Sequence, residues 1–231
     1  VYTTDPRITK KARKLARVSY EEMLELAGAG AKVLQTRSVE LAMRHRVRLQ
    51  VLSSFSDEPG TLVCDEEEIM ESRVVSGIAF SRDEAQVTVG GVQDRPGIAA
   101  SIFGALSEAG VNVDMIVQNV SAEGVTDMTF TLPADDVPRA TAALEAAREG
   151  AGLGFAKIET NPDVAKVSIV GVGMRSHSGV AHRMFAALAA EGVNIKAITT
   201  SEIKVSVLID RKYLELAVQA LHDAFDLDRI A

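Results

Sequence analysis

The sequence contains one cysteine, Cys64, four histidines and no tryptophan among its 231 residues. A single cysteine excludes an internal disulfide, and the scattered histidines lack the paired spacing of zinc or iron ligands. No apolar run approaches the length of a membrane span, and no signal-peptide pattern opens the chain. These absences predict a protein of a reducing, cytoplasmic compartment, with no metal site of its own and no membrane contact.

Aromatic residues are also scarce, at 4%, and the formal net charge is −7. An RNA-binding βαββαβ domain needs stacking aromatics and a basic face, so nucleic acid is not expected as a partner. The charge is uneven, because residues 1–50 hold eleven Lys or Arg against five Asp or Glu, a net of +6 that leaves −13 for the remainder. A basic first segment would suit phosphate groups, although a solvated helix face gives the same composition.

The length and the 47% hydrophobic content allow one large domain or two to three small ones. The chain opens abruptly, and we expect it to be the middle of a longer protein. Residues 1–62 are predicted to form a first unit, in which Ser19 and Glu22 make the capping-box start of a helix. Its elements are an extended opening, helices at 19–28 and 31–46 and a strand at 47–53. The acidic run 65–68 is predicted to be an exposed linker, within a linker region spanning 63–73.

The remainder of the chain is a tandem repeat. Aligning Gly97 with Gly179 at an offset of 82 also pairs Phe103 with Phe185, Leu106 with Leu188, Gly110 with Gly192, Val111 with Val193 and Asn112 with Asn194. The first copy predicts strands at 86–92, 112–121 and 126–132 and helices at 98–109 and 137–148. The second predicts strands at 166–172, 194–202 and 204–209 and helices at 180–191 and 213–225. Each copy therefore reads βαββα.

The two copies differ in how the sheet is completed. A further strand near 155–159 completes a βαββαβ module in the first copy, whereas the second copy ends without a final strand. An open edge is a liability, and the spare strand at 74–80 has the composition to fill it. We therefore predict that residues 74–80 cross over to the second module, giving domains of 81–160 and of 74–80 with 161–231.

A strand changes to a helix within residues 91–100, where period two gives way to period 3.6 after Pro96-Gly97. A helix that begins directly after a strand presents unpaired N–H groups and the positive end of its dipole, which favours an anionic group such as a ligand carboxylate. The alternative is that Pro-Gly is only a good turn.

Two such modules, each with a Gly-ended strand, a turn into a helix and an Asn after that helix, resemble paired ACT domains, the amino-acid-sensing modules of metabolic enzymes. The preceding residues resemble the end of the kinase domain of the aspartokinase family. The motifs are Val1-Tyr2-Thr3-Thr4-Asp5-Pro6-Arg7, Ser19-Tyr20-Glu21-Glu22-Met23-Leu24-Glu25-Leu26, Gly30-Ala31-Lys32-Val33-Leu34, Arg37-Ser38-Val39-Glu40 and Ser53-Ser54-Phe55. The resemblance implies an α+β chain with two ferredoxin-like ACT modules behind the C-terminal part of an α/β amino acid kinase domain.

The resemblance further implies that Tyr2, Arg7 and Lys32 contact the nucleotide, ATP with Mg²⁺. An aromatic ring can pack on adenine, and two cations can neutralise phosphates. Asp5 is expected to hold the loop. The chain departs from the family after Lys32, where Gln35-Thr36 replaces a common His-Pro. The family's N-terminal Lys-Phe-Gly-Gly motif and aspartate-binding residues are absent, so no catalytic residue is assigned and the chain alone is expected to be inactive.

For the effector, the resemblance points to the turn and the strand that follows its helix. Acidic side chains would accept from the ammonium of a free amino acid, and helix N–H groups would donate to its carboxylate. In the first module the residues are Asp94, Arg95, Pro96, Gly97, Ile98, Ala99, Asn112, Val113, Asp114 and Gln118. In the second module they are Val180, Ala181, Asn194, Ile195, Ser201 and Glu202.

The turn of the second copy is two residues longer and has Ser178 where relatives often have proline, so its site is expected to be looser or empty. Asn112 and Asn194 could each merely cap the turn from helix to strand. His177 is predicted to be a surface loop residue. The larger apolar residues of the helices, Phe103, Met184 and Phe185, are predicted to be core.

The implied function is the regulatory half of an aspartokinase, which binds threonine or lysine and pairs with a second copy through its ACT modules. Inhibition would then be a coupling free energy between the effector and the substrates, aspartate and ATP. Two other readings stay open. One is a stand-alone regulatory subunit, which could start at Met70 and work with a separate catalytic subunit, and the other is a nucleic-acid-binding ferredoxin-like protein.

Overall fold

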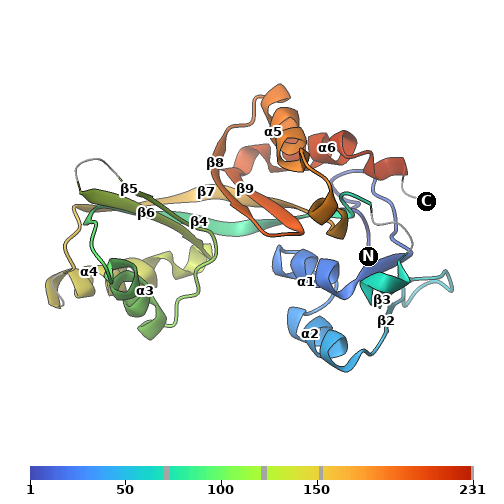
Figure 1. Cartoon of the computed structure of the whole chain (residues 1–231), viewed down its shortest axis with the longest axis horizontal. Helices are drawn as coiled ribbons and strands as arrows, with labels where there is room; N and C mark the ends of the chain where they lie inside the picture. The colour runs from blue at the N-terminus through green and yellow to red at the C-terminus, as the bar shows by residue number, and fades with distance from the viewer. Residues whose placement is uncertain (70–72, 121–123, 151–152, 230–231) are drawn as a thin grey trace. The chain divides into compact units, whose positions relative to one another are not determined.

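The computed structural model of the chain describes residues 1–69, 73–120, 124–150 and 153–229. The chain forms two compact units, one made of Val1–Ser81 with Lys166–Ala231 and the other of Arg82–Ala165 (Figure 1). We call them unit 1 and unit 2. Two long strands, β4 (Gly77–Gln93) and β7 (Lys157–Val170), contribute residues to both units. We call residues 1–69 the kinase-like segment. The described strands outside it form one sheet in the order β5-β6-β4-β7-β9-β8.

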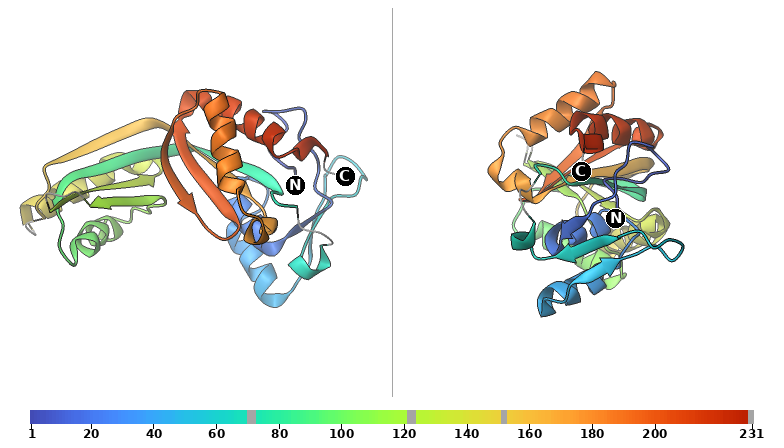
Figure 2. Two further views of the ribbon diagram at one scale, coloured as in Figure 1. Left: turned by 45° about the horizontal axis from the view of Figure 1, so that its top comes forward. Right: turned by 90° about the vertical axis from the view of Figure 1, so that its right-hand side faces the viewer.

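Unit 2 holds the first module. Its elements are most of β4, α3 (Ile98–Glu108), β5 (Ile116–Val120), β6 (Val125–Leu132), η2 (Ala134–Asp136), α4 (Val137–Gly150) and the start of β7. Alternation along β4 buries Ala85, Val87 and Val89 against α3 and α4, and leaves Gln86 and Thr88 half-buried on the other side. Figures 1 and 2 show both helices on one face of the sheet. The module is therefore a split βαβ fold.

The second module lies in unit 1. It comprises the end of β7, η3 (Val172–Ser176), α5 (Val180–Ala190), β8 (Ile195–Thr200), β9 (Lys204–Asp210), η4 (Arg211–Tyr213), α6 (Leu214–Ala224) and η5 (Leu227–Arg229). Residues 74–80 are not a separate strand, because β4 begins at Gly77 and continues without interruption. The Ser76 N–H donates to the Val170 C=O at 2.8 Å, at the end of β7. The predicted boundaries at 80/81 and 160/161 fall inside β4 and β7, and the domain assignment stays a prediction.

The two modules repeat the same backbone at the start of the first helix. Gly97 and Gly179 precede α3 and α5 with φ of 90° and 86°, a left-handed conformation that glycine adopts at little cost. The repeat predicted from the sequence is present in the fold, and the α+β class with two ferredoxin-like modules is confirmed. Most predicted elements agree within two residues. The strand predicted to begin at 112 begins at Ile116 as β5, and the strands predicted at 86–92 and 166–172 are parts of the longer strands β4 and β7.

The N-terminal region, for which the sequence predicted a unit of residues 1–62, contains a small sheet. Its strands, in order, are β1 (Arg17–Ser19), β3 (Thr61–Cys64) and β2 (Leu49–Val51). α1 (Tyr20–Gly28) begins at the predicted capping box, in which Ser19 and Glu22 exchange hydrogen bonds. The second helix was predicted too long, because α2 (Thr36–His45) starts five residues later than expected. β1 and β3 were not predicted, since strands of three and four residues are too short to show a period.

The prediction of an exposed linker at 65–68 is wrong. Residues Glu66–Glu68 form the short helix η1, and Asp65, Glu66 and Glu68 are half-buried. The guanidinium of Arg48 forms an ion pair with Glu68, and the guanidinium of Arg17 donates to the Glu68 C=O at 2.7 Å. Basic side chains distant in sequence thus hold the acidic run, which a local reading of charge could not detect.

The kinase-like segment and the second module share one hydrophobic core within unit 1. Met23 and Leu26 of α1 are buried together with Ala79 of β4 and Val170 of β7. Segments that share a core stabilise each other, so the second module and the preceding segment are one folded body.

Candidate functional site

The turn that precedes α3 is exposed along residues 94–97. Its backbone is closed by a bond from the Asp94 N–H to the Gly124 C=O (3.0 Å) and by one from the Ile98 N–H to the Arg95 C=O (3.2 Å). The side chains of Asp94 and Arg95 are exposed, and both residues lie within four positions of the start of α3. The positive end of the helix dipole and an exposed carboxylate therefore lie side by side, an arrangement that suits the two ends of a zwitterion.

Two of the residues predicted to contact the effector at this turn, Ile98 and Ala99, could contact it only through their backbone. The side chain of Ile98 is 4% exposed and belongs to the core of the module, and Ala99 packs against the same core. These apolar contacts fix the first turn of α3. Any ligand above the turn would meet amide groups there and not these side chains.

The structure does not bring Asp114 to the turn of its own module. The Asp114 N–H donates to the Thr131 C=O, and Thr131 of β6 pairs with Gln86 of β4. Gln86 lies eight residues before Asp94, which directly follows β4. At 3.3 Å per residue this separation is about 25 Å. Asn112 and Asp114 are exposed and Val113 is half-buried at that far end of the sheet, and the exposed Gln118 lies between the two ends, opposite Met128. One module alone therefore does not gather all the predicted residues around one ligand, and the effector site stays a prediction.

The residues of the second module that were predicted to bind the effector also lie at two opposite ends of its strands. Val180 is buried and Ala181 half-buried at the start of α5, whereas Asn194 and Ile195 lie at the start of β8, at the far end. Ser201 and Glu202 follow β8 and lie at the end that carries the turn. There, Glu202 forms an ion pair with Arg175 of the turn, with a distance of 3.4 Å.

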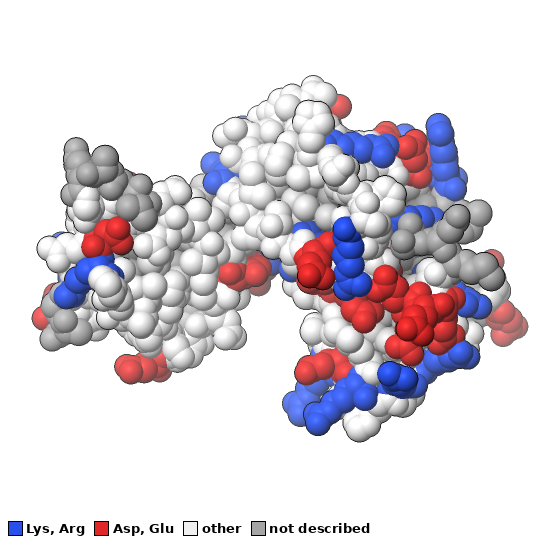
Figure 3. All heavy atoms as spheres, in the orientation of Figure 1, with Lys and Arg blue, Asp and Glu red and all other residues white. Residues whose placement is uncertain are grey.

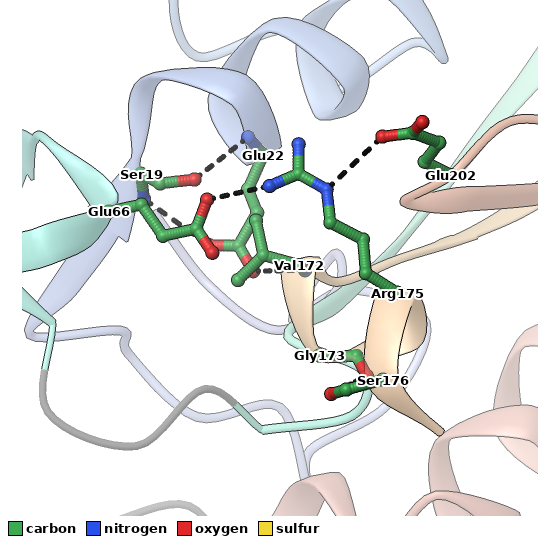
Figure 4. A network of polar contacts seen from close by, with 8 residues as sticks. All are labelled: Ser19, Glu22, Glu66, Val172, Gly173, Arg175, Ser176 and Glu202. Carbon is green, nitrogen blue, oxygen red and sulfur yellow. Dashed lines mark hydrogen bonds and ion pairs between the residues drawn. The ribbon is translucent and has the colours of Figure 1, made fainter. Parts of the chain in front are cut away.

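The turn of the second module is attached to the kinase-like segment (Figure 4). The carboxylate of Glu22, only 3% exposed, accepts from the Val172 N–H at 3.0 Å and from the Ser76 hydroxyl at 2.6 Å through Oε1. Its Oε2 accepts from the Ser19 N–H at 3.2 Å. The guanidinium of Arg175 bridges Glu66 (2.9 Å) and Glu202. We call these residues, Ser19, Glu22, Glu66, Ser76, Val172, Arg175 and Glu202, the α1 clamp.

The sequence indicated Glu22 only as a capping residue and Arg175 only as part of a long turn. The two extra residues of the turn and Ser178 in place of a proline were the signals that this turn differs from the first. Of the other predicted residues, His177 is exposed, and its Nδ1 lies 2.8 Å from the Gly173 C=O. Met184 is fully buried, while Phe103 and Phe185 are half-buried, with Phe103 edge-on to Phe130.

The three predicted nucleotide contacts are exposed on the kinase-like segment. Tyr2 is 45% exposed, and Lys32 lies in the loop after α1. Arg7 forms a bidentate pair with Asp5, with Nη2–Oδ2 at 2.7 Å and Nε–Oδ1 at 3.0 Å, and this pairing raises the pKa of Arg7. Asp5 also accepts from the Arg7 N–H, so it holds the loop as expected. Acidic and basic side chains lie next to one another on this unit in Figure 3.

The loop that carries Tyr2 and Arg7 is anchored to α6 of the second module. The Thr3 hydroxyl lies 2.9 Å from Nε2 of His222, whose side chain is fully buried. Gln219 donates to the Ile8 C=O at 2.9 Å, and Lys11 pairs with Asp223 at 2.7 Å. Burial lowers the pKa of His222, so the ring is neutral at neutral pH.

No helix of the described residues is long and apolar enough to cross a membrane. Within the same residues, no cluster of three His, Cys, Asp or Glu side chains could hold a metal ion.

Comparison with known families agrees with the two kinds of fold. Residues 87–147 and 167–225 match the ACT domain model, and residues 1–53 match the amino acid kinase family. The chain is therefore a tandem ACT protein that carries the end of an amino acid kinase domain. An aspartate kinase of Pseudomonas putida is 56% identical over 230 residues, which cover 99% of this chain and 55% of that protein. The chain belongs to the aspartokinase family and matches its regulatory half, which confirms the resemblance.

Three solved structures of two proteins extend this comparison. The ligand-free regulatory subunit of aspartate kinase from Thermus thermophilus is 45% identical, with a TM-score of 0.62, covering 66% of this chain and 99% of that chain. E. coli aspartokinase III is 26% identical and covers 97% of this chain and 49% of that chain. Its TM-score is 0.79 in complex with aspartate and ADP and 0.77 in complex with lysine and aspartate. The chain spans about half the length of the curated relatives it matches.

Proposed function

We propose that this chain is the regulatory half of a cytoplasmic aspartokinase. The complete enzyme would use ATP with Mg²⁺ to phosphorylate the side-chain carboxylate of L-aspartate, giving 4-phospho-L-aspartate, the first step toward lysine, threonine and methionine. Lysine, threonine or both would bind the ACT modules and inhibit it. The observation that carries this proposal is the exposed polar turn at 94–97, in a chain whose residues 1–53 match the amino acid kinase family.

The chemistry of the turn suits a free amino acid. The carboxylate of the effector would accept from the first-turn amides of α3, where the helix dipole favours negative charge. Its ammonium group would pair with Asp94, an exposed carboxylate on the same turn. The side chain of the effector, not its backbone groups, would then decide between lysine and threonine.

A complete site requires a second module, because Asp94 and Asp114 lie at opposite ends of one sheet. We infer that the turn at 94–97 of one copy faces the residues at the start of a strand in a partner copy. These residues are either 112–114 of the partner's first module or 194–195 of its second. The outer strands support such a pairing, since Ile116 on β5 and Ile198 on β8 are exposed by 46% and 43% at equivalent repeat positions. Pairing exposed apolar edges between copies would cover them and give a homodimer.

The nucleotide would bind at Tyr2, Arg7 and Lys32, on the loop before β1 and the loop after α1. E. coli aspartokinase III has been solved with aspartate and ADP, which supports a nucleotide for the complete enzyme. Arg7 is already paired with Asp5, so it would present its outward nitrogens to a phosphate while Asp5 keeps it in place.

The effector site is tested by calorimetry on this chain with lysine, threonine and both together. We expect Asp94→Ala to remove binding of the effector, since its ammonium would lose its only acidic partner on the turn. Glu108→Ala is the matched control, because Glu108 is an exposed carboxylate at the opposite end of α3. Unchanged affinity for both amino acids in the Asp94 variant would contradict the proposal.

A stand-alone regulatory subunit is the second candidate, favoured by the regulatory subunit of Thermus thermophilus, of which this chain covers 99%. Met70, its conceivable start, lies outside the described residues. The kinase-like segment disfavours this reading, because a pure sensor has no use for Tyr2, Arg7 and Lys32. The coding sequence upstream of Val1 distinguishes the two. A filter-binding assay at low salt tests the nucleic-acid reading, for which we expect no retention.

A further inference from the structure

The turn of the second module differs from that of the first in what occupies it. In the first module the turn after Val92 is exposed, whereas in the second the N–H of the equivalent Val172 is bonded to Glu22. A carboxylate of α1 thus binds the second turn internally. Because Glu22 is 3% exposed and also bonds Ser19 and Ser76, α1 has little freedom to shift without the turn.

Arg175 adds a charged bridge to the same place. It contacts Glu66, which follows β3 of the kinase-like segment, and Glu202, which follows β8 of the second module (Figure 4). Nearby, Lys204 at the start of β9 pairs with Glu25 of α1 at 2.7 Å. The second module therefore holds both ends of α1, through Glu22 at its start and through Glu25 in its last turn.

The position of α1 sets the position of Lys32. Between them, Gly30 has a φ of 113° and passes so close to β4 that a Cβ there would lie 2.2 Å from the Phe80 C=O. Gly30 therefore packs this loop directly on β4, and Lys32 follows the end of α1 by only four residues.

On another face of the second module, α6 holds the loop of Tyr2 and Arg7. Thr3 contacts His222, and the Thr3 C=O accepts from the Ile78 N–H at 2.7 Å. The Arg13 guanidinium donates to the Asp228 C=O at 3.0 Å. The loop is thus bonded directly after Tyr2, at Thr3, and again after Arg7, at Arg13.

We propose that the second ACT module positions both nucleotide-binding elements of the kinase-like segment and so passes the effector signal to them. It positions Lys32 through the α1 clamp and the Tyr2–Arg7 loop through His222. The proposal rests on the proposed function. Arg175 and His222 are positioning residues, because neither touches the nucleotide. A rearrangement of η3 or α6 would move cations away from the phosphates without altering the effector turn.

The first test is steady-state kinetics of the complete enzyme that contains this chain. We expect Arg175→Ala to raise the KM for ATP about fivefold or more, the lower end of typical coupling, while the KM for aspartate changes little. Arg175→Lys, which keeps the charge, should restore part of the loss. Arg183→Ala is the control, because Arg183 is similarly exposed and forms an ion pair with Asp226 inside the second module. An unchanged KM for ATP in the Arg175→Ala variant would overturn the proposal.

The second test measures the effector on the same variants. Arg175→Ala should weaken inhibition by lysine or threonine by a similar factor, while calorimetry on the 231-residue chain gives an unchanged effector affinity. Equal loss of inhibition in Arg175→Ala and Arg183→Ala would overturn the proposal. If lysine and threonine do not inhibit even the unmodified enzyme, the proposed function is wrong, and the change in KM for ATP still decides the positioning role.

Hydrogen exchange of the 231-residue chain gives an independent readout. We expect Arg175→Ala to accelerate exchange of α1 amides severalfold, and His222→Ala to accelerate exchange in residues 2–13, each with little effect on the other segment. His222→Gln keeps a donor and should rescue the second effect. Exchange that rises uniformly through unit 1 would indicate general destabilisation and overturn the proposal.

Discussion

The two ACT repeats have the same backbone but use their first turn differently. Residues 94–97 of the first repeat are exposed, whereas Val172 and Arg175 of the second are bonded to the kinase-like segment. The difference comes from two extra residues, which allow η3 to form and to reach Glu22 and Glu66. A short insertion can thus convert an exposed turn into a structural contact, because the helix that follows keeps its own core.

Glu22→Ala should show the largest effect on stability. It leaves the Ser76 hydroxyl and the Val172 N–H buried without their acceptor and removes half of the capping box. We expect the free energy of unfolding to fall by about 3 kcal/mol, measured by urea denaturation. Glu40→Ala, on the exposed face of α2, is the control and should change it by less than about 0.5 kcal/mol. A small effect of Glu22→Ala would mean that the second turn does not depend on the clamp.

Gly97→Ala and Gly179→Ala test whether the repeats are equivalent at the start of their first helices. Both positions have positive φ and open space where the added methyl group would lie, so each substitution should cost about 1 kcal/mol from the backbone alone. Gly104→Ala, in the interior of α3 with equally open space, should instead stabilise by up to about 1 kcal/mol. Thermal denaturation of the three variants gives the comparison. Unequal costs at Gly97 and Gly179 would show that the surroundings of the turn also contribute.

The pH dependence of stability should report on α6, since the first module has no buried histidine among its described residues. Burial lowers the pKa of His222 below its ordinary value of 6.5, although Asp223 and Asp228 oppose the shift while Lys11 and Arg13 add to it. Between the two values the unfolded chain binds a proton that the native state does not, so stability falls as pH falls below about 6.5. Urea midpoints from about pH 7.5 to about pH 5 measure this trend. It should be weaker in His222→Gln, and an identical slope in that variant would assign the trend to other groups.

Asp94→Ala should have the smallest effect on stability. The exposed carboxylate lies on a turn closed by backbone bonds, so we expect a change within about 0.5 kcal/mol. Denaturation of the variant without ligand checks this. A loss above about 1 kcal/mol would mean that a change in effector affinity could not be attributed to the lost charge alone.

The sequence predicted those features that depend on neighbours along the chain. The capping box at Ser19 and Glu22, the change of period after Pro96-Gly97 and the offset of 82 between the repeats are all local or repeated patterns, and each appears in the fold. The start of α2 was misplaced because residues 31–35 have no strong helix-breaking signal, and the structure places the N-cap at Gln35. The acidic run 65–68 was misread because its partners Arg17 and Arg48 are distant in sequence.

The amino-acid sequence by itself determined the class of the chain, its two modules and the polar turn, because hydrophobic period, glycine positions and turn chemistry act over a few residues. Only the tertiary structure decided that Asp94 and Asp114 lie at opposite ends of one sheet, and that Glu22 and His222 join the kinase segment to the second module. Strand register and burial depend on contacts between residues up to 219 positions apart, as between Thr3 and His222, and no local pattern encodes them.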